Sequence, residues 1–203
     1  MLEVVGWLFA GGLIVYGLVR GSKFPKVPPR VTIARAAPGE FVRVVGRIVD
    51  GGSLVAPITG RTCVSFDAVV RHGGPRTEDA VVTRGVRGTP FVIDDGTGKA
   101  LIDPRGAYIR VVYDHSVLDG AVERAKVADP DFLAGATGAG LQFEEGVLTL
   151  GEVVAVDGLI GDVGGDDPVY RRLADTRVRV TGARDRAAVV SELADDVGAG
   201  TRA

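Results

Sequence analysis

Short apolar runs that end at glycine, proline or aspartate are the feature that most limits what this sequence can fold into. Valine is frequent in runs such as FVRVVGRIV (residues 41–49), TCVSFDAVVR (62–71) and AYIRVVYD (107–114), which favours strands over helices. The chain scatters 30 Gly and 10 Pro along its length, as is typical of strands joined by turns. We therefore expect a mainly β fold, a compact OB-like or barrel-like domain with one or two short helices.

The segment TPFVIDDGTGKALID (residues 89–103) contains GTGK, which is compatible with a phosphate-binding loop or with a tight turn. A phosphate-binding loop has the pattern G-x-x-x-x-G-K-[ST]. Here Ile93 stands at the first glycine position and Ala100 at the hydroxyl position. Glycines that follow two aspartates instead supply the positive φ of a hairpin turn. We predict a turn without chemistry, with Gly96 and Gly98 at positive φ.

Three segments have helical signals. Ser116 is an N-cap candidate for VLDGAVERAKVA (117–128), and Asp129-Pro130 begins a short helical turn. The segment DRAAVVSELADDV (185–197) spaces its apolar residues by three and four, which predicts a helix that covers an open edge or mouth of the β core. The members of this stripe are Ala187, Val190, Leu193, Ala194 and Val197. Gly46 interrupts a predicted strand and marks a bulge or a sharp bend.

The run VVGWLFAGGLIVYGLV (residues 4–19) carries no charge and predicts a single N-terminal transmembrane helix. At 1.5 Å per residue it spans about 24 Å, slightly less than the ~30 Å hydrocarbon core. Val4 and Val19 bound the run, and Trp7 and Tyr16 lie near its ends, where amphipathic rings favour the headgroup region. A secretory signal peptide and a buried core helix are the alternatives, but the run lacks both a basic leader and a polar stripe.

Charged residues flank that run unequally. Only Glu3 precedes it, whereas four cations follow it, so the positive-inside rule places the rest of the chain in the cytoplasm. Those cations are Arg20, Lys23, Lys26 and Arg30. We divide the chain into a transmembrane anchor (1–21), a Pro-rich basic linker (22–38), a β domain (39–197) and a tail (198–203). Small residues four apart in the anchor let two helices approach, so an oligomer through the membrane helix is a further expectation. These pairs are Gly6 with Ala10 and Gly17 with Gly21.

Composition excludes several classes of partner. The net charge is −2 and aromatic residues make up 6% of the chain. A nucleic-acid partner is therefore not expected, because such proteins combine a basic face with stacking aromatics. Cys63 is the single cysteine, so the fold does not depend on an intrachain disulfide. We expect no cofactor and no metal, and the expected partners are the membrane and another protein.

Cysteine and histidine residues are the first candidates for chemistry. Cys63 lies in the middle of a predicted strand, which favours a buried structural thiol over a nucleophile. His115 precedes a predicted helix as a cap or a surface residue, and His72 lies in a predicted solvated loop. A triad of Ser65, His115 and Asp103 lacks a nucleophile-elbow sequence, so we do not favour it.

Acidic residues and one arginine are the second group of candidates. Glu144 and Glu145 are either paired carboxylates or, in the favoured interpretation, one strand-end charge and one turn partner. Arg105 binds a phosphate or a partner's carboxylate in one interpretation and forms a surface ion pair in the favoured one. A calcium loop is a weaker alternative, because the alternating oxygen ligands and terminal Glu of such a site are missing. Its ligands would be Asp94, Asp95 and Asp103.

Four stretches together resemble the GIDE-type, or beside-a-membrane (BAM), domain of membrane-bound mitochondrial and plastid E3 ubiquitin ligases and their bacterial homologues. VVGRIVDGGSLVAPITGRTCVSFDAVV (44–70) is similar to the family's G-x-V segment followed by Leu, Pro-[LI]-[ST]-G and Cys. TPFVIDDGTGKALIDPRGA (89–107) and LQFEEGVLTLGEVVAVDGLI (141–160) are similar to its F-x-[LIV]-x-D and Y/F-x-E runs. RRLADTRVRVTGARDRAAVVSEL (171–193) stands where the family's final strand and helix fall.

This resemblance covers roughly residues 40–195 and implies structural roles for the motif residues. They are Gly46, Pro57, Gly60, Cys63, Asp94, Gly98, Pro104, Gly106, Glu144, Gly151 and Gly158. The family's eukaryotic ligases also have a second membrane helix and a RING that binds two zinc ions. One cysteine with His72 and His115 gives too few ligands for a RING, so the ligase activity is not expected to come with the resemblance.

The sequence favours a membrane-anchored, non-enzymatic module that binds a protein or a ligand. One alternative is a hydrolase or protease-associated module whose site is built from scattered residues. A second is the ubiquitin-ligase activity inherited from the family, and a third is a barrel mouth that binds a lipid or another small molecule.

Overall fold

The computed structural model describes residues 27–72, 81–118, 127–133, 136, 140–162, 176–182 and 187–193. The predicted anchor, with Val4, Trp7, Tyr16 and Val19, lies outside these ranges, as do the start of the linker and the tail. Within the described ranges, no helix has the length and apolar character needed to cross a bilayer.

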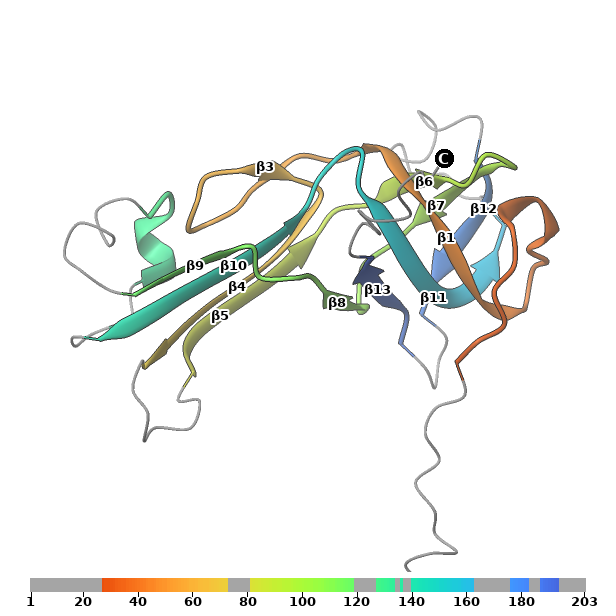
Figure 1. Ribbon diagram of the computed structural model, residues 1–203. Coiled ribbons are helices and arrows are strands. Elements are labelled where there is room, and N and C mark those ends of the chain that lie inside the picture. The colour runs from red at the N-terminus through yellow and green to blue at the C-terminus, as the bar shows by residue number, and fades with distance from the viewer. Residues whose placement is uncertain are drawn as a thin grey trace, which may run out of the picture.

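Five strands close into a barrel at the right of Figure 1, in the order β1-β6-β7-β12-β11, with β11 paired back to β1. Neighbouring strands are antiparallel except β7 and β12, which run parallel. The strands are β1 (Phe41–Gly51), β6 (Phe91–Asp94), β7 (Lys99–Ile102), β11 (Val153–Gly161) and β12 (Thr176–Thr181). The predicted mainly β, barrel-like fold is confirmed.

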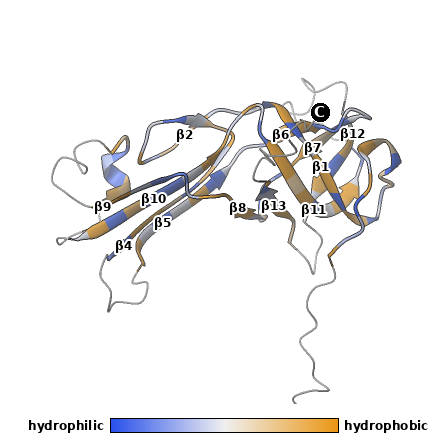
Figure 2. Cartoon of the chain, viewed as in Figure 1, coloured by the Kyte–Doolittle hydropathy of each residue, from blue (hydrophilic) through white to orange (hydrophobic). Residues whose placement is uncertain are grey.

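Alternate residues of these strands fill the barrel. Val42, Val44 and Ile48 are buried on one face of β1, because residues two apart in a strand point the same way. Phe91 and Ile93 of β6 are completely buried in the same cluster. Figure 2 shows the apolar residues along β1 and β11, and their burial is the main favourable contribution to folding.

Two further strands extend the barrel wall from β11. β13 (Val189–Glu192) pairs antiparallel with β11, and β8 (Tyr108–Arg110) pairs parallel with β13. The helix predicted over residues 185–197 is therefore wrong at 189–192, and residues 194–197 lie outside the described ranges. The pair Val189-Val190 favours a strand, and Val190 is completely buried in the barrel core opposite Val156. A short apolar run can fit the period of a strand as well as that of a helix, and here pairing with β11 selects the strand.

A four-stranded antiparallel sheet occupies the left of Figure 1, in the order β5-β4-β10-β9. It consists of β4 (Ser65–His72), β5 (Val81–Gly88), β9 (His115–Leu118) and β10 (Leu141–Leu148). These strands lie in the two long connections between barrel strands, from β1 to β6 and from β7 to β11. The hairpin of β2 (Leu54–Val55) and β3 (Thr62–Cys63) lies over one face of the sheet. Phe66, Val70 and Phe143 pack beneath it in a second core.

Ser116 does not cap a helix. Ser116, Val117 and Leu118 belong to β9, where Ser116 pairs with Glu144 of β10. Pairing with β10 outweighs the weak helical signal, and residues 119–126 lie outside the described ranges. The short helical turn predicted after Asp129 is confirmed as the 3-10 helix η2 (Pro130–Leu133). The Asp129 carboxylate accepts from the Asp131 N–H at 3.0 Å, as an N-cap does.

Gly46 marks close packing rather than a bulge. The register shift between β1 and β6 falls between Ile48 and Asp50. Gly46 remains paired with Val154, and a Cβ atom there would lie 2.9 Å from the Asp94 carbonyl oxygen. A side chain at this position would push β1 and β6 apart, so the barrel needs glycine here.

The GTG segment forms the predicted hairpin turn between β6 and β7. Asp94 pairs with Lys99, and the Asp94 carboxylate accepts from the Gly96 N–H at 2.7 Å. Gly96 has φ +82°, but Gly98 is not among the glycines at positive φ, so that part of the prediction is wrong. The Asp95 carboxylate accepts from the N–H groups of the turn and, at 2.8 Å, from Ile33 at the start of η1 (Ile33–Arg35). The hairpin is thereby fastened to the chain that leads into the barrel.

Candidate functional site

A cleft of about 410 Å³ opens beside the end of β5. Val86, Arg87 and Gly88 of β5 form one wall. Residues 104–107 and Ile109 form the other wall, and Leu54 of β2 completes the lining. Its volume falls within the range of pockets that bind small ligands, about 300–1,000 Å³.

Glycines allow the two walls to approach. A Cβ atom on Gly88 would lie 3.0 Å from the Pro104 ring and 3.2 Å from Ile109, so a larger residue would force strand and loop apart. Gly106 has φ +72°, which L-residues with a side chain rarely adopt. The Ala107 N–H closes the turn by donating to the Pro104 carbonyl at 3.0 Å. The motif residues Pro104 and Gly106 therefore shape the cleft.

Asp103 fixes Arg105 at the rim of this cleft. Its carboxylate is buried and accepts from Arg105 Nε at 2.9 Å and Nη2 at 2.7 Å, and Arg179 of β12 also donates to it. Burial alone would raise the pKa of Asp103, but the hydrogen bonds from both arginines outweigh it and hold the pKa well below its usual range. The predicted ion pair of Arg105 is confirmed, and 64% of its side chain remains exposed.

Arg87 is the second cation of the cleft. Its side chain is exposed, and it forms no ion pair within the described part of the chain. The hydroxyl of Ser65 donates to its carbonyl oxygen at 2.8 Å, which holds the strand at this point. Arg87 and Arg105 thus line one cleft from opposite walls, and guanidinium groups are donors that bind carboxylates and phosphates.

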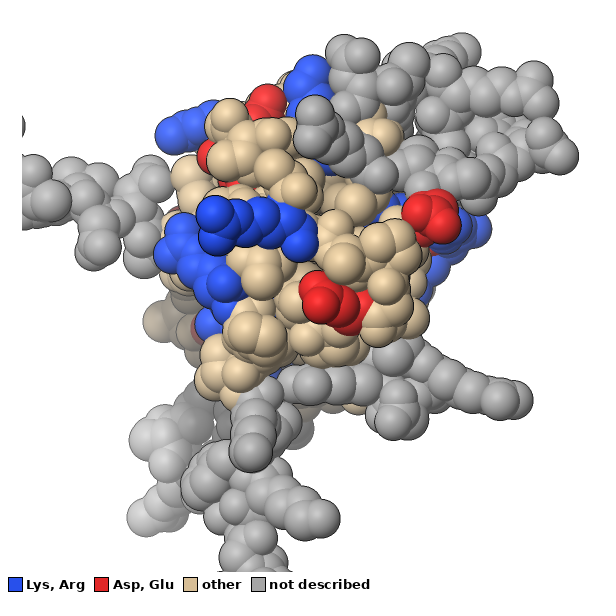
Figure 3. Space-filling model, turned by 90° about the vertical axis from the view of Figure 1, so that its right-hand side faces the viewer, with Lys and Arg blue, Asp and Glu red and all other residues tan. Residues whose placement is uncertain are grey.

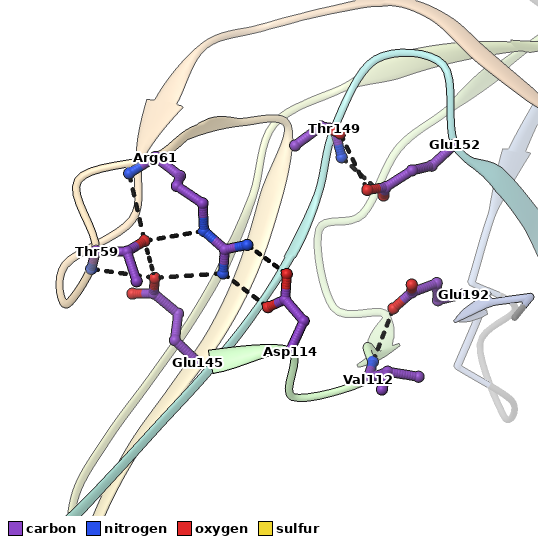
Figure 4. Close-up of polar contacts among 8 residues, drawn as sticks. All are labelled: Thr59, Arg61, Val112, Asp114, Glu145, Thr149, Glu152 and Glu192. Carbon is purple, nitrogen blue, oxygen red and sulfur yellow. Dashed lines mark hydrogen bonds and ion pairs between the residues drawn. The ribbon is translucent and has the colours of Figure 1, made fainter. Parts of the chain in front are cut away.

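A second polar cluster lies beneath the β2–β3 turn, around Glu145 (Figure 4). Glu145 is completely buried, and its carboxylate accepts from the Ile58 N–H at 2.7 Å and the Thr59 N–H at 3.2 Å. The Thr59 hydroxyl also donates to it, and Arg61 Nη2 lies 3.7 Å from Oε2. Arg61 also binds Asp114, whose pKa it lowers. Every contact holds one part of the chain to another, so this cluster fastens the turn to the sheet.

The two adjacent glutamates do not form a carboxylate pair. Glu144 points to the opposite face of β10 and bonds Arg71 Nε at 3.1 Å. The prediction that one glutamate is a turn partner is confirmed by Glu145. The prediction of a strand-end charge is wrong, because Glu144 lies within β10 and is held in an ion pair.

Glu144 shares its face of the sheet with a third polar cluster. Arg84 of β5 forms a bidentate pair with the buried Asp67 of β4, at 3.0 Å and 2.6 Å. The Tyr113 hydroxyl donates to the same carboxylate at 3.2 Å, and burial together with the Asp67 charge raises the pKa of Tyr113. Arg84 is therefore neutralised within the sheet, unlike its neighbour Arg87.

Cys63 is a buried thiol, as predicted. Its exposed fraction is 3%, and its Sγ lies 3.8 Å from the Leu54 carbonyl oxygen. Burial, and then the charge of Glu145, raise the pKa of Cys63 to about 11. A thiol in this state is a poor nucleophile at neutral pH.

The residues of the hypothetical triad are engaged separately. Ser65 donates to the Arg87 carbonyl, Asp103 holds Arg105 and Arg179, and His115 pairs in β9 with Glu145 of β10.

The carboxylates of the weaker calcium alternative are also engaged within the protein. The Asp95 carboxylate accepts hydrogen bonds from backbone N–H groups, and the Asp103 carboxylate accepts them from guanidinium groups. Across the described ranges, no three His, Cys, Asp or Glu residues gather as metal ligands. His72 ends β4, and the rest of its predicted loop lies outside those ranges.

The remaining motif residues form turns or close contacts. The Pro57 carbonyl accepts from the Asp129 N–H at 2.8 Å, and Gly60 has φ +72° in the β2–β3 turn. Gly151, at φ +93°, donates to the Ile48 carbonyl at 2.8 Å. A Cβ atom on Gly158 would overlap Val180 of β12.

Charges of both signs share the end of the barrel that Figure 3 displays. Lys and Arg gather toward one side of this view, and acidic side chains lie among them. A surface of mixed sign agrees with the net charge of −2.

The comparisons with known proteins gave no relative. No family model, no curated protein and no solved structure matches this chain.

Four residues of these polar sites were not predicted from the sequence: Arg87, Arg179, Asp67 and Tyr113. The short sequence TRGVRG (83–88) did offer a signal for Arg87, because it places two arginines and no acid on one strand. Arg179, Asp67 and Tyr113 gave no local signal, because their partners are distant in the sequence.

Proposed function

We propose that this chain is a membrane-tethered, non-enzymatic binding module that holds an acidic group of a partner protein in the cleft between β5 and residues 104–107. One observation carries the proposal: Arg87 and Arg105 reach the same cleft from opposite walls, and Arg87 has no ion pair in the described ranges. Arginine binds carboxylates and phosphates in a directional, often bidentate manner, so two guanidinium groups suit an anionic ligand, which we take to be a protein carboxylate.

The uncharged run at residues 4–19 supports the tether, and the cations after it support a cytoplasmic domain. The order of the four motif stretches supports a GIDE-type domain without a RING. The strand order, with its one parallel pair between β7 and β12, supports an OB-like barrel within it. In this proposal the long connections of the barrel build the binding surface, as loops commonly do on a rigid scaffold.

Two measurements test the proposal on the full-length chain. Alkaline carbonate washes should leave the chain in the membrane, and release of the intact polypeptide would contradict the tether. Calorimetric titration of the chain in detergent micelles should detect glutarate binding. Inorganic phosphate should bind more weakly, and the opposite order would replace the protein carboxylate with a phosphate ligand.

Matched variants locate the binding site. The double variant Arg87→Gln/Arg105→Gln should weaken glutarate binding by about tenfold, equivalent to about 1.4 kcal/mol. Arg30→Gln/Arg35→Gln removes two exposed arginines that precede β1, and it serves as the control because it changes the net charge by the same amount. Equal affinity in the double variant and the control would contradict the cleft as the site.

A further inference from the structure

Among the described strands, β5 is an edge strand, and its outer edge, called the free edge below, leads to the cleft. β5 (Val81–Gly88) pairs with β4 on one side, and no described strand pairs with its other side. Its eight residues span roughly 25 Å of backbone. Such an edge presents N–H and C=O groups to which an extended segment of another chain can add as a strand.

The orientation of these backbone groups follows from the register. Ser65 with Gly88 is the last register pair of β4 and β5, and the Ser65 hydroxyl donates to the Arg87 carbonyl at 2.8 Å, so the backbone groups of Arg87 face β4. Just beyond this pair, the Thr89 N–H donates to the Val64 carbonyl at 2.9 Å. Backbone groups alternate in direction along an antiparallel strand. The N–H groups of Arg84 and Val86 therefore point away from β4, toward the free edge.

The cleft includes this edge. Val86 lies opposite Asp67 and Arg87 lies opposite Phe66, so their side chains point to opposite faces of the sheet. Both residues line the cleft, which therefore wraps around the end of β5. A strand added along β5 would arrive with its side chains beside Arg87 and Arg105.

Charge decides which occupant fits. β5 carries Arg84 and Arg87 and no acidic residue, and Asp67 neutralises only Arg84. Two copies of β5 placed edge to edge would bring further arginines to the same surface. Opposite charges across a strand pair are favourable and like charges are not, so an acidic segment fits better than a second copy.

We propose that the module binds an acidic, extended segment of a partner protein by strand addition to the free edge of β5, with a carboxylate of that segment in the cleft. This inference rests on the proposed function and adds the conformation and chemistry of the partner. Backbone pairing supplies part of the affinity, and the arginines select acidic segments.

A synthetic peptide with four Glu-Val repeats, blocked at both ends, is the probe. We expect it to bind the full-length chain in micelles and to slow amide hydrogen exchange at Arg84 and Val86 at least tenfold. The same peptide with N-methyl groups on alternate residues should lose this protection, because it cannot complete the ladder. The matching Lys-Val peptide should bind at least tenfold more weakly.

Several outcomes would overturn the inference. Equal binding of the Lys-Val peptide would remove the acidic preference, and full binding of the N-methylated peptide would remove strand addition. Slow exchange at Arg84 and Val86 without peptide would show that the chain itself or a second copy already covers the edge, and a dilution series would separate these two. If glutarate binds but the peptide gives no protection, the cleft stands and strand addition fails. If glutarate does not bind, the proposed function fails.

Discussion

The N–H of Ile58 donates a hydrogen bond of 2.7 Å to the carboxylate of Glu145, although 87 residues separate them in the sequence. This bond fastens the β2–β3 turn to the middle of β10. It also accounts for a completely buried carboxylate, since N–H and hydroxyl donors satisfy its oxygens.

Loss of the Glu145 carboxylate should destabilise the fold. Glu145→Ala leaves buried donors of Ile58 and Thr59 without an acceptor, and we expect a loss of about 3 kcal/mol in the free energy of unfolding. Urea unfolding measures this change. Glu144→Gln is the control, because Glu144 lies on the other face of β10 and should cost under about 1 kcal/mol. A Glu145→Ala variant as stable as this control would contradict the fastening role.

Acid should weaken the fold through Asp103. Its pKa is lowered in the folded protein, so its contribution to stability is fully present above the unfolded value of about 3.9 and is lost as the pH falls through the lower folded value. Asp103→Asn should be less stable at pH 7, and its stability should change less between pH 4 and pH 2. Urea midpoints across this range measure the difference, and parallel curves for the two proteins would disprove the prediction.

The Cys63 thiol should react slowly in the folded chain. With a pKa of about 11, its thiolate fraction at pH 8 is on the order of 200-fold smaller than that of an unfolded cysteine with a pKa near 8.5. Reaction with a disulfide reagent should therefore be slow without urea and fast in urea. A fast native reaction would show that the thiol is accessible and ionised.

Gly158 should not tolerate a side chain. A Cβ atom there would lie 2.4 Å from a methyl carbon of Val180, so Gly158→Ala should cost about 2–3 kcal/mol by overpacking. Gly161→Ala is the matched control on the same strand, because nothing lies within 4 Å of a Cβ atom at that position. Thermal unfolding compares the two variants, and equal melting temperatures would contradict the close contact of β11 with β12.

The strands and turns of this fold are largely visible in the sequence. Valine-rich runs predict the β elements, and the DDGTG turn is recognisable because Gly96 supplies a positive φ that few residues can adopt. The helix predicted over 185–197 is wrong at residues 189–192, because Val189 and Val190 satisfy a strand period as well as a helical one. Hydrogen bonding to the edge of β11, which the local sequence does not reveal, selects the strand.

The site was harder to foresee, because its contacts join distant positions. The sequence predicts an ion pair of Arg105 but not its partner, which is Asp103, two residues away. Arg179 reaches the same carboxylate from 76 residues away. Arg87 and Arg105 line the same cleft only because β5 ends against the loop of residues 104–107. Such juxtapositions depend on the closed barrel and cannot be read from sequence spacing.

The most direct test of the central claim follows the amide signals of Gly88 and Gly106 while glutarate is added to the isotope-labelled full-length chain. These two glycines line opposite walls of the cleft. Both signals should shift and saturate together, and Arg87→Gln should require several-fold more glutarate for the same shift. Signals that never saturate, or shifts confined to the barrel end away from β5, would contradict the central claim.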